Sequence, residues 1–414
     1  MKVLILGAGS KISKPLFSSL KNEEEITPIW VSSKPQPTWL QSGTWLNAPY
    51  TNKEDFTNLL VEQSPQYVVN LNAFTDVDGC EEDKMLAMFL NYELPDMLSE
   101  VCEENNIDFV HISTDYIFSG EVGLCEINDK PSDKNLNWYG ITKRDGENAV
   151  VERFGCVIRT NFIYGNPEAK SFVSWVIDSL SEEKEISIAY DQFSNPAYLQ
   201  DVANVIVICI LKNIKGIIHT GGKDWMSRWE LAQVIALSKG IAPHVYSKYL
   251  KPVDSLTLNQ KAIRPKFAGL GIRKSEIILD YSFKGIYDVL LEESSFRKDE
   301  GFEENPNYQI FKKLIFLLKQ IDNSVRKKGI FEIKKMDYGT ISISINSELY
   351  FVSIEVGKSS YSGLIYGMDK EKELSYKLIT GDLYDDSSII YFLKELNELF
   401  LEIDYHKIKH FIER

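Results

Sequence analysis

The stretch KVLILGAGSKIS (residues 2–13) decides the fold, because an apolar strand runs through a glycine-containing turn directly into a helical pattern. Gly7 and Gly9 stand where glycines let a pyrophosphate approach backbone N–H groups at a helix N-terminus. Ile12 or Ser13 occupies the place where a third glycine usually allows close helix packing. A tight turn with no ligand is the alternative interpretation.

Apolar runs and helical patterns alternate from this stretch to about residue 165. The runs are KVLILGAG, ITPIWVSS, QYVVNLNA, DFVHIST and CVIRTNFIYG, and the helical patterns lie near 11–21, 53–62, 82–104 and 139–153. Such alternation predicts an α/β fold, in which parallel strands are covered by helices on both faces. We therefore expect a Rossmann-type doubly wound parallel sheet in residues 1–165.

The pattern becomes mixed after about residue 170. Helices are expected near 170–182, 200–212 and 228–239, with short strands such as EISIAY and GIIHTGG between them. This composition predicts a smaller mixed α/β substrate lobe over residues 166–291, with residues 191–215 returning to the Rossmann domain.

A charged linker, EESSFRKDEGFEENP (residues 292–306), precedes a different kind of pattern. Strand-like runs in residues 307–414 are joined by connections too short for helical crossovers, so we expect an α+β accessory domain with an antiparallel sheet. A helix is expected at 386–403. Without a catalytic pattern, residues 307–414 are expected to bind a protein partner or to self-associate.

The bulk composition excludes several classes of protein. A net charge of −14 with no local basic block argues against binding nucleic acid. No apolar run would span a bilayer, and the N-terminal run is too short and glycine-rich for a signal peptide, so neither a membrane partner nor export is expected and the protein should be cytoplasmic. The five scattered cysteines predict reduced thiols and no metal site.

A tyrosine and a lysine lie four positions apart in LNWYGITKRDGE (residues 136–147). On a helix, Tyr139 and Lys143 would be neighbours, and an ammonium there would stabilise a phenolate and lower the pKa of the tyrosine. Thr114 ends the apolar strand FVHIST and could polarise a carbonyl group. Two unrelated neighbours on an ordinary helix are the alternative.

The second apolar run ends in Ser32, Ser33 and Lys34, where an acidic residue would hold the adenine ribose of NAD. Two hydroxyl groups and an ammonium suit a ribose phosphate instead. These residues favour NADP, and a solvated polar loop is the alternative.

Together these motifs resemble one family, the extended short-chain dehydrogenase/reductases, and within it the dTDP-4-dehydrorhamnose reductase group. The resemblance covers roughly residues 1–290. Its most specific segments are VVNLNAFTDVDGCE (68–81), FVHISTDYIFSGE (109–121), YGITKRDGE (139–147), IRTNFIYG (158–165), DQFSNPAYLQDVA (191–203), GIIHTGG (216–222) and IRPKFAGL (263–270).

The resemblance implies roles for individual residues. The catalytic residues would be Thr114, Tyr139 and Lys143. The cofactor, NADP in preference to NAD, would bind Gly7, Gly9, Ser10, Lys11, Ile12, Ser32, Ser33, Lys34, Asn47, Asn70, Leu71, Asn72, Ala73, Tyr139 and Lys143. The substrate, a nucleotide sugar, would bind Thr75, Asp115, Phe118, Asn161, Gln192, Phe193 and Arg264. Asn91 would support the backbone of the active site.

Several positions depart from the family pattern. Asn47 replaces an acidic residue near the adenine, Asn72 replaces a small apolar residue, and Phe267, Ala268 and Gly271 stand where asparagine, serine and aspartate are usual. The implied activity is NAD(P)H-dependent reduction of a keto group on a nucleotide-linked sugar or similar metabolite. The alternatives are a cofactor-sensing regulatory or scaffold protein that acts through its C-terminal domain, and a nucleotide-sugar epimerase or dehydratase.

Four other groups of polar residues have simpler interpretations. In TDVDGCEED (75–83), Asp76 and Asp78 are expected to begin a helix. His406 and His410 have the spacing of two metal ligands but no third ligand. His111 is interpreted as a core histidine, and His219 as a structural residue in a strand of the smaller lobe.

Overall fold

The computed structural model describes residues 1–21, 23–40, 43–165, 171–295, 306–321, 323–327, 329–335, 341–346, 350–356, 360–367 and 375–382. The chain divides into two compact units, which are described separately. The first unit comprises Met1–Ser171, Gln192–Lys223 and Asn259–Gly285, and the second comprises Phe172–Asp191, Asp224–Leu258 and Ile286–Arg414.

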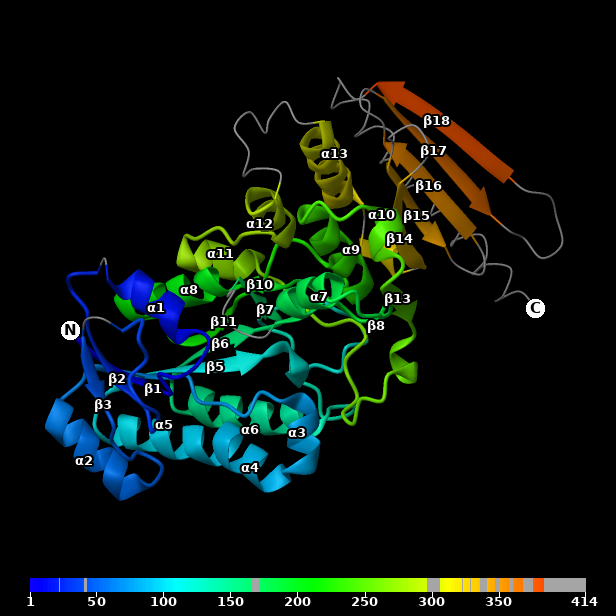
Figure 1. The fold of residues 1–414 in the computed structure, drawn as a ribbon. Coiled ribbons are helices and arrows are strands. Elements are labelled where there is room, and N and C mark those ends of the chain that lie inside the picture. Colours follow the sequence, from blue (N-terminus) through cyan, green and yellow to red (C-terminus); the bar gives the residue numbers. More distant parts are fainter. Residues whose placement is uncertain are drawn as a thin grey trace. The chain divides into compact units, whose positions relative to one another are not determined.

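A seven-stranded parallel sheet forms the centre of the first unit (Figure 1). Its strand order is β11-β6-β5-β4-β1-β2-β3, so the chain starts in the middle of the sheet and winds outward in both directions. The strands are β1 (Lys2–Leu6), β2 (Thr27–Val31), β3 (Thr44–Leu46), β4 (Tyr67–Asn70), β5 (Asp108–Thr114), β6 (Cys156–Thr160) and β11 (Gly216–His219). The doubly wound sheet predicted from the alternating pattern is confirmed.

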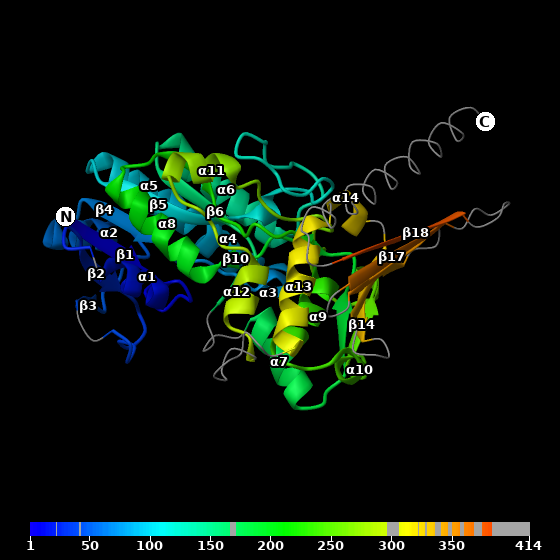
Figure 2. The same ribbon diagram turned by 90° about the horizontal axis from the view of Figure 1, so that it is seen from above.

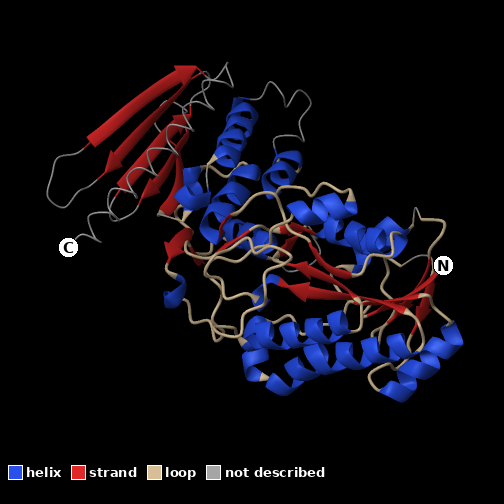
Figure 3. Cartoon of the chain, turned by 180° about the vertical axis from the view of Figure 1, so that it is seen from behind, coloured by secondary structure: helices blue, strands red, loops and turns tan. Residues whose placement is uncertain are grey.

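Helices cover both faces of this sheet, which lies between two helical layers in Figure 3. One layer contains α1 (Ser13–Leu20), α8 (Leu199–Leu211) and α11 (Arg273–Leu279), and Figure 2 shows α1 beside α8. The other layer contains α2 (Lys53–Gln63), α5 (Leu94–Glu104) and α6 (Trp138–Glu152). Shorter elements of this unit are α3 (Val77–Glu82), α4 (Lys84–Met88), the π-helix η1 (Phe89–Glu93), the 3-10 helix η2 (Asp115–Ile117), β7 (Ile163–Tyr164), β9 (Phe193–Ser194) and β10 (Ala197–Tyr198).

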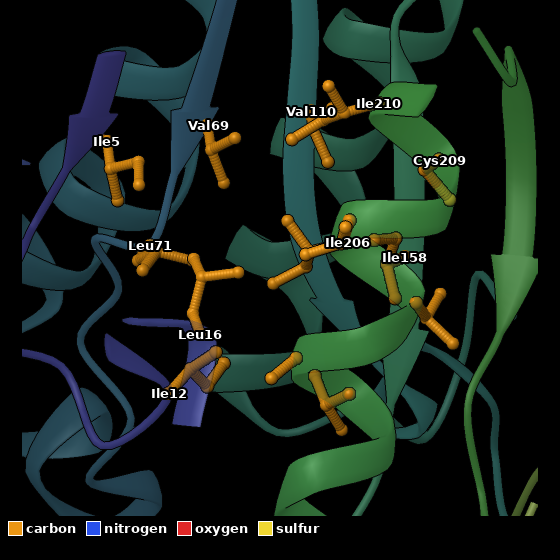
Figure 4. Close-up of a cluster of buried hydrophobic side chains, with 14 of the residues drawn as sticks. Ile5, Ile12, Leu16, Val69, Leu71, Val110, Ile158, Ile206, Cys209 and Ile210 are labelled. Carbon is orange, nitrogen blue, oxygen red and sulfur yellow. The ribbon is translucent and has the colours of Figure 1, made fainter. Parts of the chain in front are cut away.

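The apolar residues of β1 alternate between two hydrophobic cores. Val3 and Ile5 pack in the core that includes α1 and α8, part of which is shown in Figure 4. Leu4 and Leu6 pack in the core on the opposite face, which includes residues of α2 and α5. Because successive side chains of a strand point to opposite faces, a strand buried on both sides needs an unbroken apolar run, and KVLIL supplies it.

The second unit contains the remaining part of the chain that the structure describes. Strands β8 (Ile186–Ala189) and β13 (Leu250–Val253) pair in parallel. The other elements of its first half are α7 (Phe172–Ser181), β12 (Met226–Ser227), α9 (Arg228–Ser238), α10 (Pro243–Tyr246), the 3-10 helix η3 (Ser255–Thr257) and α12 (Ile286–Glu292).

The C-terminal part of this unit begins with two helices, α13 (Pro306–Gln320) and α14 (Asn323–Arg326). An antiparallel sheet with the order β14-β15-β16-β17-β18 follows, as predicted. Its strands are β14 (Ile330–Lys335), β15 (Ile341–Asn346), β16 (Tyr350–Val356), β17 (Ser360–Gly367) and β18 (Ser375–Asp382). The helix expected at 386–403, together with His406 and His410, lies outside the described residues.

Three segments differ from expectation. Residues 259–285 were expected in the smaller lobe, but they belong to the first unit. GIIHTGG was expected in the smaller lobe, but Gly216–His219 pairs with β6 as the edge strand of the large sheet, because α8 returns the chain to that sheet. His219 therefore belongs to the first unit. The short edge strand β3 has no clear apolar run and was not predicted. Over the residues that the structure describes, no helix combines the length and the apolar character needed to cross a membrane.

Candidate active site

The glycine turn after β1 leaves room that only a glycine can provide. Gly7 has φ +74°, and a Cβ atom there would lie 2.9 Å from the backbone nitrogen of Asn72. The N-cap residue Ile12 supplies no side-chain cap to α1, and its own backbone N–H donates to the Ser10 hydroxyl at 3.1 Å. The turn and the helix N-terminus thus have the shape and the backbone donors that suit a pyrophosphate.

Ser32 and Lys34 lie beside this turn. The Ser32 hydroxyl accepts a hydrogen bond from the backbone N–H of Lys34 at 3.1 Å. A Cβ atom on Gly9 would meet Cδ of Lys34 at 3.3 Å, so the lysine stem passes over the turn. Ser33 and Asn47, which follow β2 and β3, are exposed. The structure therefore brings a hydroxyl group and an ammonium to the glycine turn.

The segment after β4 contributes buried amides. Asn70 is fully buried and Leu71 belongs to the core beneath α1. The Tyr50 hydroxyl donates to Oδ1 of Asn72 at 3.1 Å, and burial raises the pKa of Tyr50. Asn72 packs against Gly7, whereas Ala73 is partly exposed.

Thr114 and Tyr139 meet at the carboxyl end of β5. Thr114 is the last residue of that strand, Tyr139 lies in the first turn of α6, and the Thr114 side chain lies close enough to lower the pKa of the Tyr139 phenol. The Thr114 hydroxyl itself donates to Oδ1 of Asp115 at 3.3 Å. Helix α6 can pack closely against η2 because residue 140 is a glycine. A Cβ atom there would lie 2.3 Å from the carbonyl oxygen of Tyr116. The Tyr116 ring contacts that of Tyr139 edge to face, with the centroids 5.8 Å apart.

The electrostatics of Tyr139 differ from expectation. Burial raises the pKa of Tyr139, while the neighbouring Thr114 hydroxyl lowers this pKa and the nearby Asp115 carboxylate raises it. The predicted lowering by Lys143 is not found, because Nζ of Lys143 turns toward β5 instead. There it donates to the carbonyl oxygen of Ile112 at 2.5 Å and lies 3.2 Å from Nε2 of His111.

Lys143 is a buried amine. Its side chain is 1% exposed, and burial lowers the pKa of Lys143 to about 8, while the Glu147 carboxylate one turn later raises it. Glu147 is itself paired with Arg159 of β6 at 2.5 Å, in an ion pair that is 1% exposed on both sides. The charge of Glu147 is thus already matched by Arg159.

Three residues predicted to bind substrate make contacts with other residues of the protein. Oδ2 of Asp115 accepts a hydrogen bond from the backbone N–H of Gly269 at 3.0 Å. The Phe118 ring lies under the Arg159 guanidinium, 5.2 Å from ring centroid to Cζ. The Asn161 amide donates to the carbonyl oxygen of Asn195.

The other predicted substrate residues also belong to the first unit. The rings of Phe193 and Phe267 are tilted to each other with centroids 5.7 Å apart, and the Gln192 amide donates to the side-chain oxygen of Gln260. Arg264 pairs with Asp78 at 2.5 Å. Thr75 is exposed.

The acidic run 75–83 is explained by these contacts. Asp76 caps the N-terminus of α3 through the Gly79 N–H and Asp78 lies in the first turn of this helix, both as expected. Asp78 also pairs with Arg264. Among the described residues, no group of three or more histidine, cysteine, aspartate or glutamate side chains is arranged to hold a metal ion.

Asn91 connects the elements around the site. Its side chain accepts a hydrogen bond from the Phe74 N–H at 2.8 Å and donates to the Phe74 carbonyl oxygen at 3.1 Å. It also donates to the hydroxyl of Thr142 in α6 at 3.3 Å. This fully buried amide fixes the segment after β4 against the helix that carries Tyr139.

Comparison with known proteins places these features in a family. The model of the RmlD substrate binding domain matches residues 1–284. A dTDP-4-dehydrorhamnose reductase from Streptomyces griseus is 32% identical over 222 residues, which are 51% of this chain and 70% of that protein. A probable dTDP-4,6-dihydroxy-2-methyloxan-3-one 4-ketoreductase from Streptomyces antibioticus is 29% identical over 276 residues, 66% of this chain and 87% of that protein.

The fold also matches solved structures. The dTDP-4-dehydrorhamnose reductase of Bacillus anthracis, solved in complex with NADP, superimposes with a TM-score of 0.60 at 24% identity. The match covers 70% of this chain and 97% of that one. The family model ends at residue 284, so the described residues from 306 onward lie outside it.

Proposed function

This chain belongs to the RmlD substrate binding domain family, and from this premise we propose that it is an NAD(P)H-dependent reductase of a keto group on a nucleotide-linked sugar. The observation that carries the proposal is the approach of Thr114, the last residue of β5, to Tyr139 in the first turn of α6. The pair lies at the carboxyl edge of the parallel sheet, where ligands bind in this architecture. The relatives of this chain that are named as reductases of dTDP-linked keto sugars support the same substrate class.

The residues of this chain would divide the work of carbonyl reduction. Tyr139 donates its phenolic proton to the carbonyl oxygen as negative charge develops there. Thr114 donates a second hydrogen bond to the same oxygen and so stabilises that charge. Lys143 lies one helical turn from Tyr139 and supplies the positive charge that a phenolate needs after the proton has left.

The glycine turn fits a dinucleotide, because Gly7 keeps the backbone open where a Cβ atom would clash. When bound, NADPH would supply the hydride. Gly7, Gly9 and the first turn of α1 would hold its pyrophosphate, and Ser32 and Lys34 would hold the ribose phosphate. We prefer NADP to NAD because these two side chains are donors beside the turn, and neither is an acid that would select ribose hydroxyl groups.

A direct assay tests the reductase proposal. Purified full-length protein should oxidise NADPH, followed by its absorbance, when a dTDP-linked 4-keto sugar is added. Bound NADPH without oxidation, over a panel of dTDP- and UDP-linked keto sugars, would contradict turnover. That result would favour the alternative of a cofactor-sensing protein.

Replacing Lys34 by Ala should weaken NADPH binding selectively. Loss of a charge-assisted hydrogen bond costs about 1.5–3 kcal/mol, so the Kd for NADPH should rise roughly 10- to 100-fold. The Kd for NADH should change less than about twofold, because no phosphate contact is lost. Titration of both nucleotides by protein fluorescence measures the two constants.

A matched control is Lys21→Ala, which removes an exposed lysine at the other end of α1. It should leave both dissociation constants near those of the parent protein. Equal weakening of NADPH and NADH binding in Lys34→Ala would show that Lys34 does not select the ribose phosphate.

A further inference from the structure

A chain of hydrogen bonds runs from the segment after β4 to Lys143. The backbone N–H of Asn72 donates to Oδ1 of Asn70 at 3.0 Å, and the Asn72 side-chain amide donates to the same oxygen at 2.9 Å. A backbone N–H can only donate, so it identifies this atom of Asn70 as the oxygen. The amide nitrogen of Asn70 must then face His111, whose Nδ1 lies 3.2 Å away.

This orientation fixes the tautomer of His111. Since the Asn70 amide donates, Nδ1 of His111 accepts, and a neutral imidazole then carries its proton on Nε2. The ring is fully buried and stacks on Phe109 with an interplanar angle of 8°. Burial lowers the pKa of His111, which keeps the ring neutral.

The protonated Nε2 faces Nζ of Lys143 at 3.2 Å. An ammonium has three donors and no acceptor, so two donors would oppose each other across this contact. A neutral amine removes the conflict, because its lone pair accepts from His111 Nε2–H while one of its own N–H groups donates to Ile112. Every hydrogen bond in the chain is then satisfied.

We propose that His111 is a positioning residue that holds Lys143 as an uncharged amine, through a ring tautomer that Asn70 sets. The catalytic consequence rests on the proposed function. An uncharged Lys143 does not stabilise a Tyr139 phenolate, so Lys143 must take a proton from solvent when its amine leaves His111. His111 thereby controls when the positive charge appears beside Tyr139.

Other titratable groups lie near Lys143 and Tyr139. Glu147 on the same helix acts on Lys143 and pairs with Arg159 of β6, whereas Asp115 and Tyr116 of η2 and Cys80 of α3 act on Tyr139. Glu147 favours the ammonium form of Lys143, but its charge is matched by Arg159. The direction of the hydrogen bond between His111 and Lys143 therefore decides whether Lys143 is an amine or an ammonium.

Nitrogen NMR of the full-length protein without added ligand tests the tautomer. The chain has five histidines, so selective 15N-histidine labelling gives five rings, and His111→Gln identifies the signal of His111. Between pH 6 and 8 we expect a neutral ring protonated at Nε2. A ring protonated at Nδ1, or one that becomes doubly protonated in this range, overturns the proposal. Neither outcome depends on whether the protein is a reductase.

Asn70→Asp should reverse the hydrogen bond between residue 70 and His111, because an aspartate carboxylate accepts a hydrogen bond from Nδ1–H. Nδ1 should become protonated, and a neutral ring would then present Nε2 as an acceptor that favours the ammonium of Lys143. The control is Asn72→Ala, which keeps the backbone N–H that orients Asn70 and should retain the parent tautomer. An unprotonated Nδ1 in Asn70→Asp contradicts the role of Asn70.

A kinetic measurement separates positioning from a merely structural role. In kcat/KM, activity that requires the ammonium falls as pH rises through the pKa of Lys143. In Asn70→Asp the pH at which kcat/KM falls should rise by about one unit or more, since the ammonium form of Lys143 is favoured. A lower kcat/KM that falls at the same pH as in the parent protein would indicate a structural role alone. Absence of turnover in the parent protein would refute the proposed function but leave the NMR result interpretable.

Discussion

Replacing Tyr139 by Phe should lower kcat by about 10²- to 10⁴-fold, because the variant retains the ring but loses the proton donor. The ring of Tyr139 packs edge to face on Tyr116, and Phe preserves that contact. The fold and the cofactor affinity should therefore remain. NADPH oxidation gives kcat, and thermal unfolding together with NADPH titration confirms an intact protein.

Tyr116→Phe is the matched control. It removes a second phenolic hydroxyl within the same aromatic pair and should change kcat much less than Tyr139→Phe does. Retention of full turnover by Tyr139→Phe would exclude the phenol as proton donor. In that case another donor must serve, and Thr114, whose hydroxyl lies near Tyr139, would be the next residue to replace.

Much of the first unit could be predicted because its signals are local. The apolar run of β1 and the glycine turn are contiguous in sequence, and KVLIL packs on both faces of the sheet as its composition requires. Pairing of GIIHTGG with β6 could not be predicted in this way. It depends on α8 bringing the chain back to the sheet, a contact between distant segments.

The candidate site was predicted in its residue types but not in its contacts. Spacing alone suggested that Lys143 acts on Tyr139, whereas the side chain bonds His111 and Ile112. The sequence nevertheless held one signal that was missed. Asn70 and His111 are register partners at neighbouring strands, and a polar pair inside two apolar runs needs a buried partner.

The same distinction applies to the chain after residue 306. The sequence predicted an antiparallel sheet from short connections, and the sheet is present. It did not reveal that this segment is bonded to the rest of the second unit. Gln233 of α9 exchanges hydrogen bonds with the backbone of Phe331 and Ile333, and the Tyr246 hydroxyl donates to the Ile333 carbonyl oxygen at 2.6 Å.

Arg326→Ala should destabilise the second unit by about 3–5 kcal/mol, because it leaves a buried carboxylate without its partner. Arg326 is 3% exposed and pairs with Glu230 of α9, which is 1% exposed. Arg326 also donates to the Tyr287 hydroxyl at 3.2 Å. The free energy of unfolding, from urea titration followed by circular dichroism, measures the loss.

Two further variants identify the cause. Lys319→Ala removes a more exposed ion pair with Asp288 and should cost only about 0–1 kcal/mol. Replacing both members of the buried pair, as Arg326→Met with Glu230→Leu, should recover much of the loss, because no unpaired charge then stays buried. If Arg326→Ala has the same free energy of unfolding as the parent protein, the ion pair between Arg326 and Glu230 does not stabilise the second unit. If it is destabilised as expected, these residues help to hold the second unit folded, and removing them would disrupt that unit as well as any partner surface.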